Sequence, residues 1–159
     1  MNPTVFTIGH GSRTFDDIVE VLRRHGVAMV VDVRSRPSSR HAPDFVKGRL
    51  ETLAAAAGLG YRWMGGVLGG SPADPALLDE EGRIDAEAVR HRPAYRAALD
   101  VVGAMARDAG IALLCAEEDP EHCHRATLLA PDLIALGHRV SHLHADGRAT
   151  PHQDPLGLA

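Results

Sequence analysis

The sequence predicts a single-domain three-layer α/β sandwich with a mostly parallel five-stranded sheet and helices on both faces. Short apolar runs alternate along the chain with segments of helical periodicity. Two of these runs are apolar almost throughout, as is typical of strands buried on both faces. The length of 159 residues suits one domain, so we expect residues 1–147 to form it and residues 148–159 to form a C-terminal tail.

The start of the chain is expected to hold one strand and one helix. Residues 4–10 are a short β-rich run that ends in Gly-His. The segment 14–26 has the apolar spacing of a helix. Thr14 can cap this helix, Asp17 follows three residues later as in a capping box, and Gly26 can end it. The sheet is therefore expected to begin with a strand–loop–helix unit.

The middle of the chain continues this alternation and then becomes irregular. Residues 27–33 are a continuous apolar run, and residues 34–43 form a polar loop broken by prolines. Helical spacing returns over 44–58, and residues 61–64 are expected to be the third strand. Residues 65–92 are too long for a routine connection, so they are expected to form a lid or to be partly helical.

The last third supplies two more strands and two more helices. A helix is expected over 93–110, followed by a buried strand over 111–116. Residues 121–137 are expected to form a helix that is kinked at Pro131, because proline interrupts the helical hydrogen bonds. The alternating residues 138–145 complete a five-stranded sheet.

Charge and composition restrict the class of protein. The formal net charge of -4 argues against a strong, non-specific nucleic-acid binder, which would normally be basic. The first ten residues do not resemble a signal peptide, and no apolar run is long enough for a membrane span. We therefore expect a cytoplasmic protein with reduced thiols and no membrane partner. Two cysteines are too few for a disulfide scaffold.

The candidate site lies at the carboxyl ends of the expected strands, where parallel sheets bind ligands. Four strands run there into polar or glycine-rich loops, with the sequences GHGSR, DVRSRPSSR, GGVLGG and CAEEDPEHCHR. The candidate catalytic residues at this edge are Cys115, His10 and Asp32. The candidate ligand-binding residues are Arg34, Arg40, Glu117 and Arg125. A small anionic or phosphate-bearing ligand suits this set.

Each candidate catalytic residue has a functional and a structural interpretation. Cys115 ends a strand before a helix, where helix amides lower the pKa of a thiol, but a small buried cysteine would fit there equally well. His10 suits a general acid or base, or a hydrogen bond that anchors its loop. Asp32 suits a reactive group, or a carboxylate that holds a loop amide or an arginine.

The arginines offer a second interpretation, in which the protein binds a ligand without catalysis. The loop from Arg34 to Arg40 combines three arginines with three serines, and this density of donors suits phosphate. It would serve a non-catalytic nucleotide or nucleic-acid binding module, or it is a solvated loop. Arg125 lies in the first turns of a helix, so its expected partners are Glu117, Asp32 or a ligand anion.

A metal site at Cys115, Cys123 and His124 is the third interpretation. The Cys-x7-Cys-His spacing is not common for zinc. Neighbouring residues on a helix point about 100° apart, so Cys123 and His124 are not expected to face the same edge. Cys123 is therefore expected to be packed, and no metal ligand, cofactor or oligomeric state is predicted.

Four stretches together resemble the domain of unknown function 488 family. They are TIGHGSRTFDDIVEVLRRHGV, VVDVRSRPSSRHAPDF, YRWMGGVLGG and LLCAEEDPEHCHRATLLAPDLIALGHRVSHL. The resemblance extends from about Thr4 to His144, and its most specific part is the CAE…P..CHR signature. Gly11 stands where the family commonly has serine after Gly-His. The resemblance implies a fold and a pocket, and no established activity.

A weaker analogy links the chain to rhodanese-like domains. The order of VVDVRS, IALLCAEEDPEHCHR and GHRVSHLHADG is similar to theirs, with an Asp-Val-Arg strand end and a later strand that ends in cysteine. The loop after Cys115 lacks their compact glycine-containing form. The analogy therefore concerns the fold alone.

Overall fold

The centre of the computed structural model, which describes residues 3–38 and 41–153, is a six-stranded sheet of order β3-β2-β4-β1-β5-β6. The strands are β1 (Thr4–Gly9), β2 (Val27–Asp32), β3 (Gly60–Trp63), β4 (Gly110–Cys115), β5 (Arg139–Leu143) and β6 (Ala149–Pro151). Neighbouring strands are parallel except β5 and β6, which are antiparallel. The expected α/β fold with a mostly parallel sheet is confirmed.

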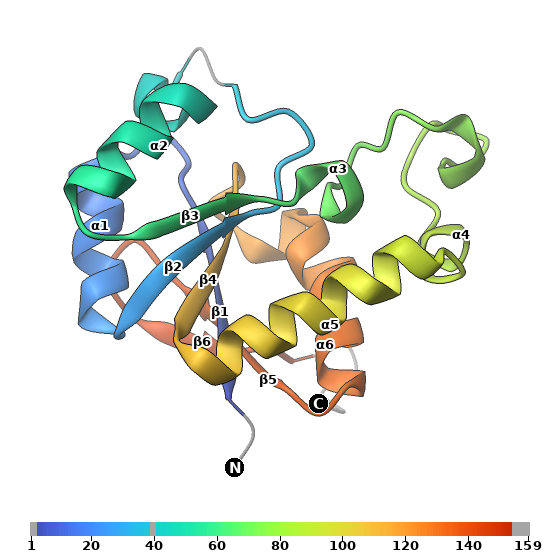
Figure 1. Cartoon of the computed structure of the whole chain (residues 1–159). Coiled ribbons are helices and arrows are strands. Elements are labelled where there is room, and N and C mark those ends of the chain that lie inside the picture. The colour runs from blue at the N-terminus through green and yellow to red at the C-terminus, as the bar shows by residue number, and fades with distance from the viewer. Residues whose placement is uncertain (1–2, 39–40, 154–159) are drawn as a thin grey trace.

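Helices cover both faces of the sheet (Figure 1). They include α1 (Phe15–Arg24) and α2 (Lys47–Ala56) on one face, and α5 (Pro93–Asp108) and α6 (Ala130–Ala135) on the other. The alternation of β4 explains this arrangement. Ala112 and Leu114 belong to the core beneath α1 and α2, whereas Ile111 and Leu113 belong to the core beneath α5 and α6. A central strand with two apolar faces therefore needs helices on both sides.

The start of α1 follows the expected capping box. The Thr14 side-chain oxygen accepts a hydrogen bond from the Asp17 backbone N–H at 3.2 Å. The Asp17 carboxylate accepts one from the Thr14 backbone N–H at 3.4 Å. These two bonds satisfy backbone groups that the first helical turn leaves without partners. Helix α1 therefore begins at Phe15, directly after the capping residue Thr14.

Residues 148–159 are expected from the sequence to form a tail, but three of them form the sixth strand, β6. Gly147 has a φ of 88°, a left-handed conformation that glycine adopts without strain, and the chain reverses there. Thr150 then pairs with His142, and Pro151 with Ser141. Proline is tolerated in β6 because an edge strand need not donate on its outer side. The five-stranded sheet of the sequence prediction is therefore extended by one short strand.

Two irregular regions lie beside the carboxyl ends of β2 and β4, namely the segment 65–92 and the segment between β2 and α2. The segment 65–92 is partly helical, with α3 (Gly65–Leu68), the 3-10 turn η2 (Pro75–Leu77) and α4 (Ala86–Arg90). Leu78 and Ile84 form an isolated antiparallel bridge within it. A further 3-10 turn, η1 (Pro43–Phe45), precedes α2. The described part of the chain has no helix that is long and apolar enough to cross a membrane.

The helix expected over 121–137 is divided into three pieces. The 3-10 turn η3 (Pro120–His122) comes first, then the π-helical η4 (Arg125–Leu129), and then α6. Pro131 lies in the first turn of α6, directly after the π-helical residues. A π-type pattern accommodates the missing proline N–H, so the expected irregularity at Pro131 is present as a change of helix type. Cys123 adopts an extended conformation between η3 and the helix.

Candidate functional site

A cleft of about 1170 Å³ opens at the carboxyl ends of β2 and β4. The loop after β2 lines it with Arg34, Ser35, Arg36 and Ser38. Gly70, Ser71 and Pro72 line it after α3, and residues 78 and 82–84 approach from the irregular segment. Residues 115–117 and 121–124 close it from the β4 side, together with Thr127. The cleft thus lies where parallel sheets bind their ligands.

Arg34 pins the loop that forms one wall of this cleft. Its Nε and Nη2 donate to the two carboxylate oxygens of Asp32, at 2.8 and 2.7 Å. Its Nη1 donates to the backbone carbonyl of Phe45 at 2.6 Å. Asp32 is fully buried and also accepts a hydrogen bond from the Tyr61 hydroxyl. Asp32 and Arg34 are therefore placed to hold the loop, as the structural interpretation of Asp32 describes.

His10 lies behind Arg34 and does not line the cleft. Its ring stacks on Phe45 with centroids 4.5 Å apart. Its Nδ1 donates to the Gly11 carbonyl at 2.8 Å, which leaves Nε2 to accept from Arg34 Nη1 at 3.4 Å. Burial lowers the pKa of this imidazole, so the neutral form is favoured. The structure therefore places His10 as an anchor of its loop.

Arg36 is the arginine that faces the cleft with an uncommitted charge. Its side chain is exposed, and within residues 3–38 and 41–153 it forms no ion pair. Arg83 also lines the cleft, but it pairs with Asp79 and Glu81. Arg40, a candidate from the sequence, lies outside the described residues. The sequence pointed to this loop through its density of arginines, but it could not separate Arg36 from Arg34.

Hydroxyl and carboxylate groups complete the polar lining. The Ser35 side-chain oxygen accepts a hydrogen bond from the Ser71 backbone N–H at 2.9 Å, which ties the two walls of the cleft together. Ser38 and Thr127 are further lining residues with hydroxyl groups. Glu117 and Glu121 contribute negative charge on the β4 side. Glu117 thus lines the cleft, as the sequence predicted for this edge.

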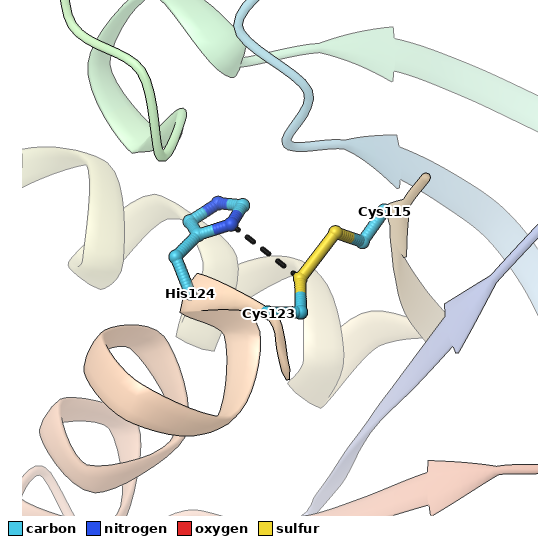
Figure 2. A group of neighbouring side chains, drawn as sticks. All are labelled: Cys115, Cys123 and His124. Carbon is cyan, nitrogen blue, oxygen red and sulfur yellow. Dashed lines mark hydrogen bonds between the residues drawn. A yellow bond between two sulfur atoms is a disulfide. The ribbon is translucent and has the colours of Figure 1, made fainter. Parts of the chain in front are cut away.

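A disulfide joins Cys115 to Cys123 at the floor of the cleft (Figure 2). Each cysteine is only 6% exposed. The expectation of two reduced thiols is therefore corrected, because β4 and the extended residue Cys123 bring the two sulfurs together. Cys123 is buried as expected, but it is turned toward Cys115. A cystine carries no thiolate, so any nucleophilic role of Cys115 belongs to the reduced protein.

His124 lies beside the cystine, contrary to the expectation that it and Cys123 point apart. Its Nδ1 is 3.6 Å from Cys123 Sγ (Figure 2). Its Nε2 donates to the Leu68 carbonyl at 2.9 Å. Neighbouring side chains point about 100° apart only within a helix, and Cys123 is extended and lies outside the helix. Burial lowers the pKa of His124, which favours its neutral form.

Arg125 lies beneath the loop and outside the cleft lining. It is fully buried, and its Nη2 donates to the backbone carbonyl of Glu118 at 2.7 Å. Among the described residues, its Nε and Nη1 have no hydrogen-bond partner. Burial and the nearby charge of Arg13 lower its pKa to about 10. Arg125 therefore lies outside the cleft lining that includes Cys115 and Glu117, while the charge of Glu117 acts on it from nearby.

Comparisons with known proteins give one match. The family model described as "Domain of unknown function DUF488" matches residues 14–130, which is more than half of the chain. A search of curated proteins found no match. A search of solved structures also found none.

Proposed function

The chain belongs to the DUF488 family, and we propose that it binds a small anionic, phosphate-bearing ligand in the strand-end cleft, above Cys115. The observation that carries this proposal is the position of Arg36. Its charge faces a cleft of about 1170 Å³ and is not used by an ion pair among the described residues. A guanidinium beside hydroxyl groups is a donor set that suits phosphate oxygens.

The rigid surroundings of Arg36 support this function. The neighbouring Arg34 is fixed by Asp32 and by the Phe45 carbonyl, so the loop begins from an anchored residue. Ser35 is held by Ser71 across the cleft. A binding loop held in place loses less entropy when its ligand arrives. A small ligand fits better than a nucleic acid, because the charge of Arg34 is already paired with Asp32 and the net charge of the chain is -4.

Cys115 gives the proposed pocket a reactive floor after reduction. A dithiol reduces the cystine in two thiol–disulfide exchange steps. The dithiol is oxidised to its own disulfide, and Cys115 and Cys123 become thiols. The Cys115 thiolate then lies at the end of β4 and faces the ligand space. A bound anion above it would shield its sulfur from reagents. Shielding therefore links the proposed ligand to this cysteine.

The test measures protection of Cys115 from alkylation in reduced, metal-free protein. Iodoacetamide, which is uncharged, is applied with and without inorganic phosphate or pyrophosphate, and labelling of Cys115 is followed by mass spectrometry. We expect pyrophosphate to slow the labelling, and salt to weaken the protection by screening. In Arg36→Ala, the concentration needed for protection should rise about tenfold or more, because a charge-assisted hydrogen bond is lost.

The matched control is Arg139→Ala, which removes an exposed arginine at the start of β5, the opposite end of the parallel strands. In this variant, pyrophosphate should protect Cys115 from labelling as well as it does in the unmodified protein. The proposal is refuted if phosphate and pyrophosphate leave the labelling rate unchanged. Equal weakening in Arg36→Ala and Arg139→Ala would also count against it, since the effect would then be one of net charge.

A further inference from the structure

We propose that the reduced protein binds one zinc ion through Cys115, Cys123 and His124, and that formation of the disulfide abolishes this site. Each of the three residues offers one ligand atom, and these atoms all lie within 4.8 Å of one another. Two thiolates and one imidazole form a common donor set for Zn²⁺. This metal site is separate from the proposed anion binding, because it requires the zinc ion and no other ligand.

The sulfur–nitrogen distance already suits a tetrahedral metal. Zn–S bonds of about 2.3 Å and Zn–N bonds of about 2.0 Å at a tetrahedral angle place the two ligand atoms roughly 3.5 Å apart. Cys123 Sγ and His124 Nδ1 are 3.6 Å apart. The sulfur of Cys123 and the ring nitrogen of His124 are therefore already at about the separation that a shared zinc ion requires.

The hydrogen bond from His124 to Leu68 fixes the tautomer that a metal requires. The Leu68 carbonyl only accepts, so His124 Nε2 carries the proton. The lone pair of Nδ1 is then directed at the sulfurs (Figure 2). Metal-binding histidines typically donate their other ring nitrogen to such a carbonyl. Gly70 makes room for this ring, because a Cβ at that position would lie 2.8 Å from His124 Cγ.

The backbone allows the two sulfurs to separate after reduction. The Cα atoms of Cys115 and Cys123 are 7.5 Å apart. This spacing is wider than the roughly 4.4–6.8 Å that is usual across disulfides. Two thiolates on one zinc ion lie about 3.8 Å apart, a distance that follows from the same bond lengths and tetrahedral angle. Rotation of the side chains can reach this separation without closing the backbone spacing.

The charge and the access of the site also suit zinc. Two thiolates neutralise the charge of Zn²⁺, and a neutral imidazole adds none, so the group is tolerated where the cysteines are buried. All three residues line the cleft. Three protein ligands leave a fourth position, which faces this space and would take water or an anion. Such an open position is the arrangement of catalytic rather than structural zinc.

The redox step balances with a named reductant. A phosphine supplies two electrons to the cystine and takes an oxygen atom from water, whose two protons give the two thiols. Zn²⁺ then displaces both thiol protons as it binds. Exchange with a small-molecule disulfide reverses this step: that disulfide takes the two electrons and, with two protons from water, leaves as two thiols. The Cys115–Cys123 bond forms again, which removes two of the three ligands and releases the metal. Zinc binding therefore depends on the redox state of the pair.

The test is a zinc titration of the full chain in both redox states. Reduced, phosphine-free protein competes with a chromogenic chelator for Zn²⁺, and Co²⁺ serves as a spectroscopic probe. We expect one equivalent of zinc on the reduced protein and none on the oxidised protein. The Co²⁺ form should show a thiolate-to-metal charge-transfer band and the visible bands of a tetrahedral site. Zinc affinity should fall more than about 100-fold in Cys123→Ser and in His124→Ala.

The matched control is His91→Ala, which removes an exposed histidine outside the cleft lining and should leave zinc affinity unchanged. Circular dichroism verifies that the variants are folded, and the Co²⁺ spectrum of the unmodified protein tests the site without any variant. A reduced protein without a stoichiometric zinc ion, or a Co²⁺ complex without the charge-transfer band, would overturn the proposal. Arg36→Ala should bind zinc normally, so failure of the anion proposal is distinguishable from failure of this one.

Discussion

At the scale of single residues, the buried Asp32–Arg34 pair determines the shape of the cleft wall. Both side chains are almost fully enclosed, and they are joined by two hydrogen bonds between the guanidinium and the carboxylate. Burial removes both charges from water, so each depends on the other for compensation. The pair therefore fixes the backbone at the start of the loop that contains Arg36.

This dependence predicts a large stability loss in Asp32→Asn. The neutral amide leaves the Arg34 charge buried without its counter-ion, and breaking such a pair costs about 3–5 kcal/mol. The free energy of unfolding, measured by urea denaturation at neutral pH, should fall by this amount. Asp79→Asn is the control, because the ion pair between Asp79 and Arg83 is exposed and is worth only about 0–1 kcal/mol. Equal stability of the two variants would contradict the structural role of Asp32.

At the scale of elements, the β5–β6 hairpin contains a buried histidine with a strongly shifted pKa. His142 bonds to the Thr7 hydroxyl at 2.6 Å and to His152 at 3.0 Å. Burial, and then the charge of Arg125, lowers its pKa to about 4 from the ordinary value of 6.5. The neutral ring therefore links β5 to β1 and to the residue after β6.

The lowered pKa predicts that stability falls as the pH drops from 6.5 to 4. In this range the unfolded chain binds a proton at His142 and the folded chain does not, so protonation favours unfolding. Above pH 6.5 both states are neutral and the effect is absent. Urea denaturation across this range should show a smaller slope for His142→Gln than for the unmodified chain. His91→Gln, an exposed control in the segment after α4, should retain the slope of the unmodified chain. An unchanged slope in His142→Gln would show that other groups account for the pH dependence.

Elements set by local contacts could be predicted from the sequence, and those set by distant contacts could not. The capping box of Thr14 and Asp17 depends on residues three apart, so the pattern itself contains the structure. Strand β6 has three residues, one of them proline, and exists through its pairing with β5. Likewise, the partner of Cys123 could not be identified, because it depends on an extended residue where the pattern predicted a helix.

At the scale of the whole molecule, the family match covers half of the sheet. Residues 14–130 contain β2, β3 and β4, which lie next to one another, whereas β1, β5 and β6 form the other half. We predict that a fragment of residues 14–130 does not fold alone, because it exposes the edge of β4 that pairs with β1 and lacks the core residues Val5, Ile8 and Val140. Size-exclusion chromatography and circular dichroism should show aggregation or a loss of ordered structure. A monomeric fragment with a cooperative unfolding transition would contradict this prediction.

The central place of β1 has a consequence for the synthesis of the protein. β1 is made before its neighbours in the sheet, β4 and β5, which begin at Gly110 and Arg139. About 100 residues separate the end of β1 from the start of β4, so at translation rates of roughly 5–20 residues per second β1 waits on the order of 5–20 s for its first partner. During this interval the nascent chain presents Val5 and Ile8, which the finished protein buries completely. We therefore expect the growing chain to need chaperone protection until β4 has left the ribosome.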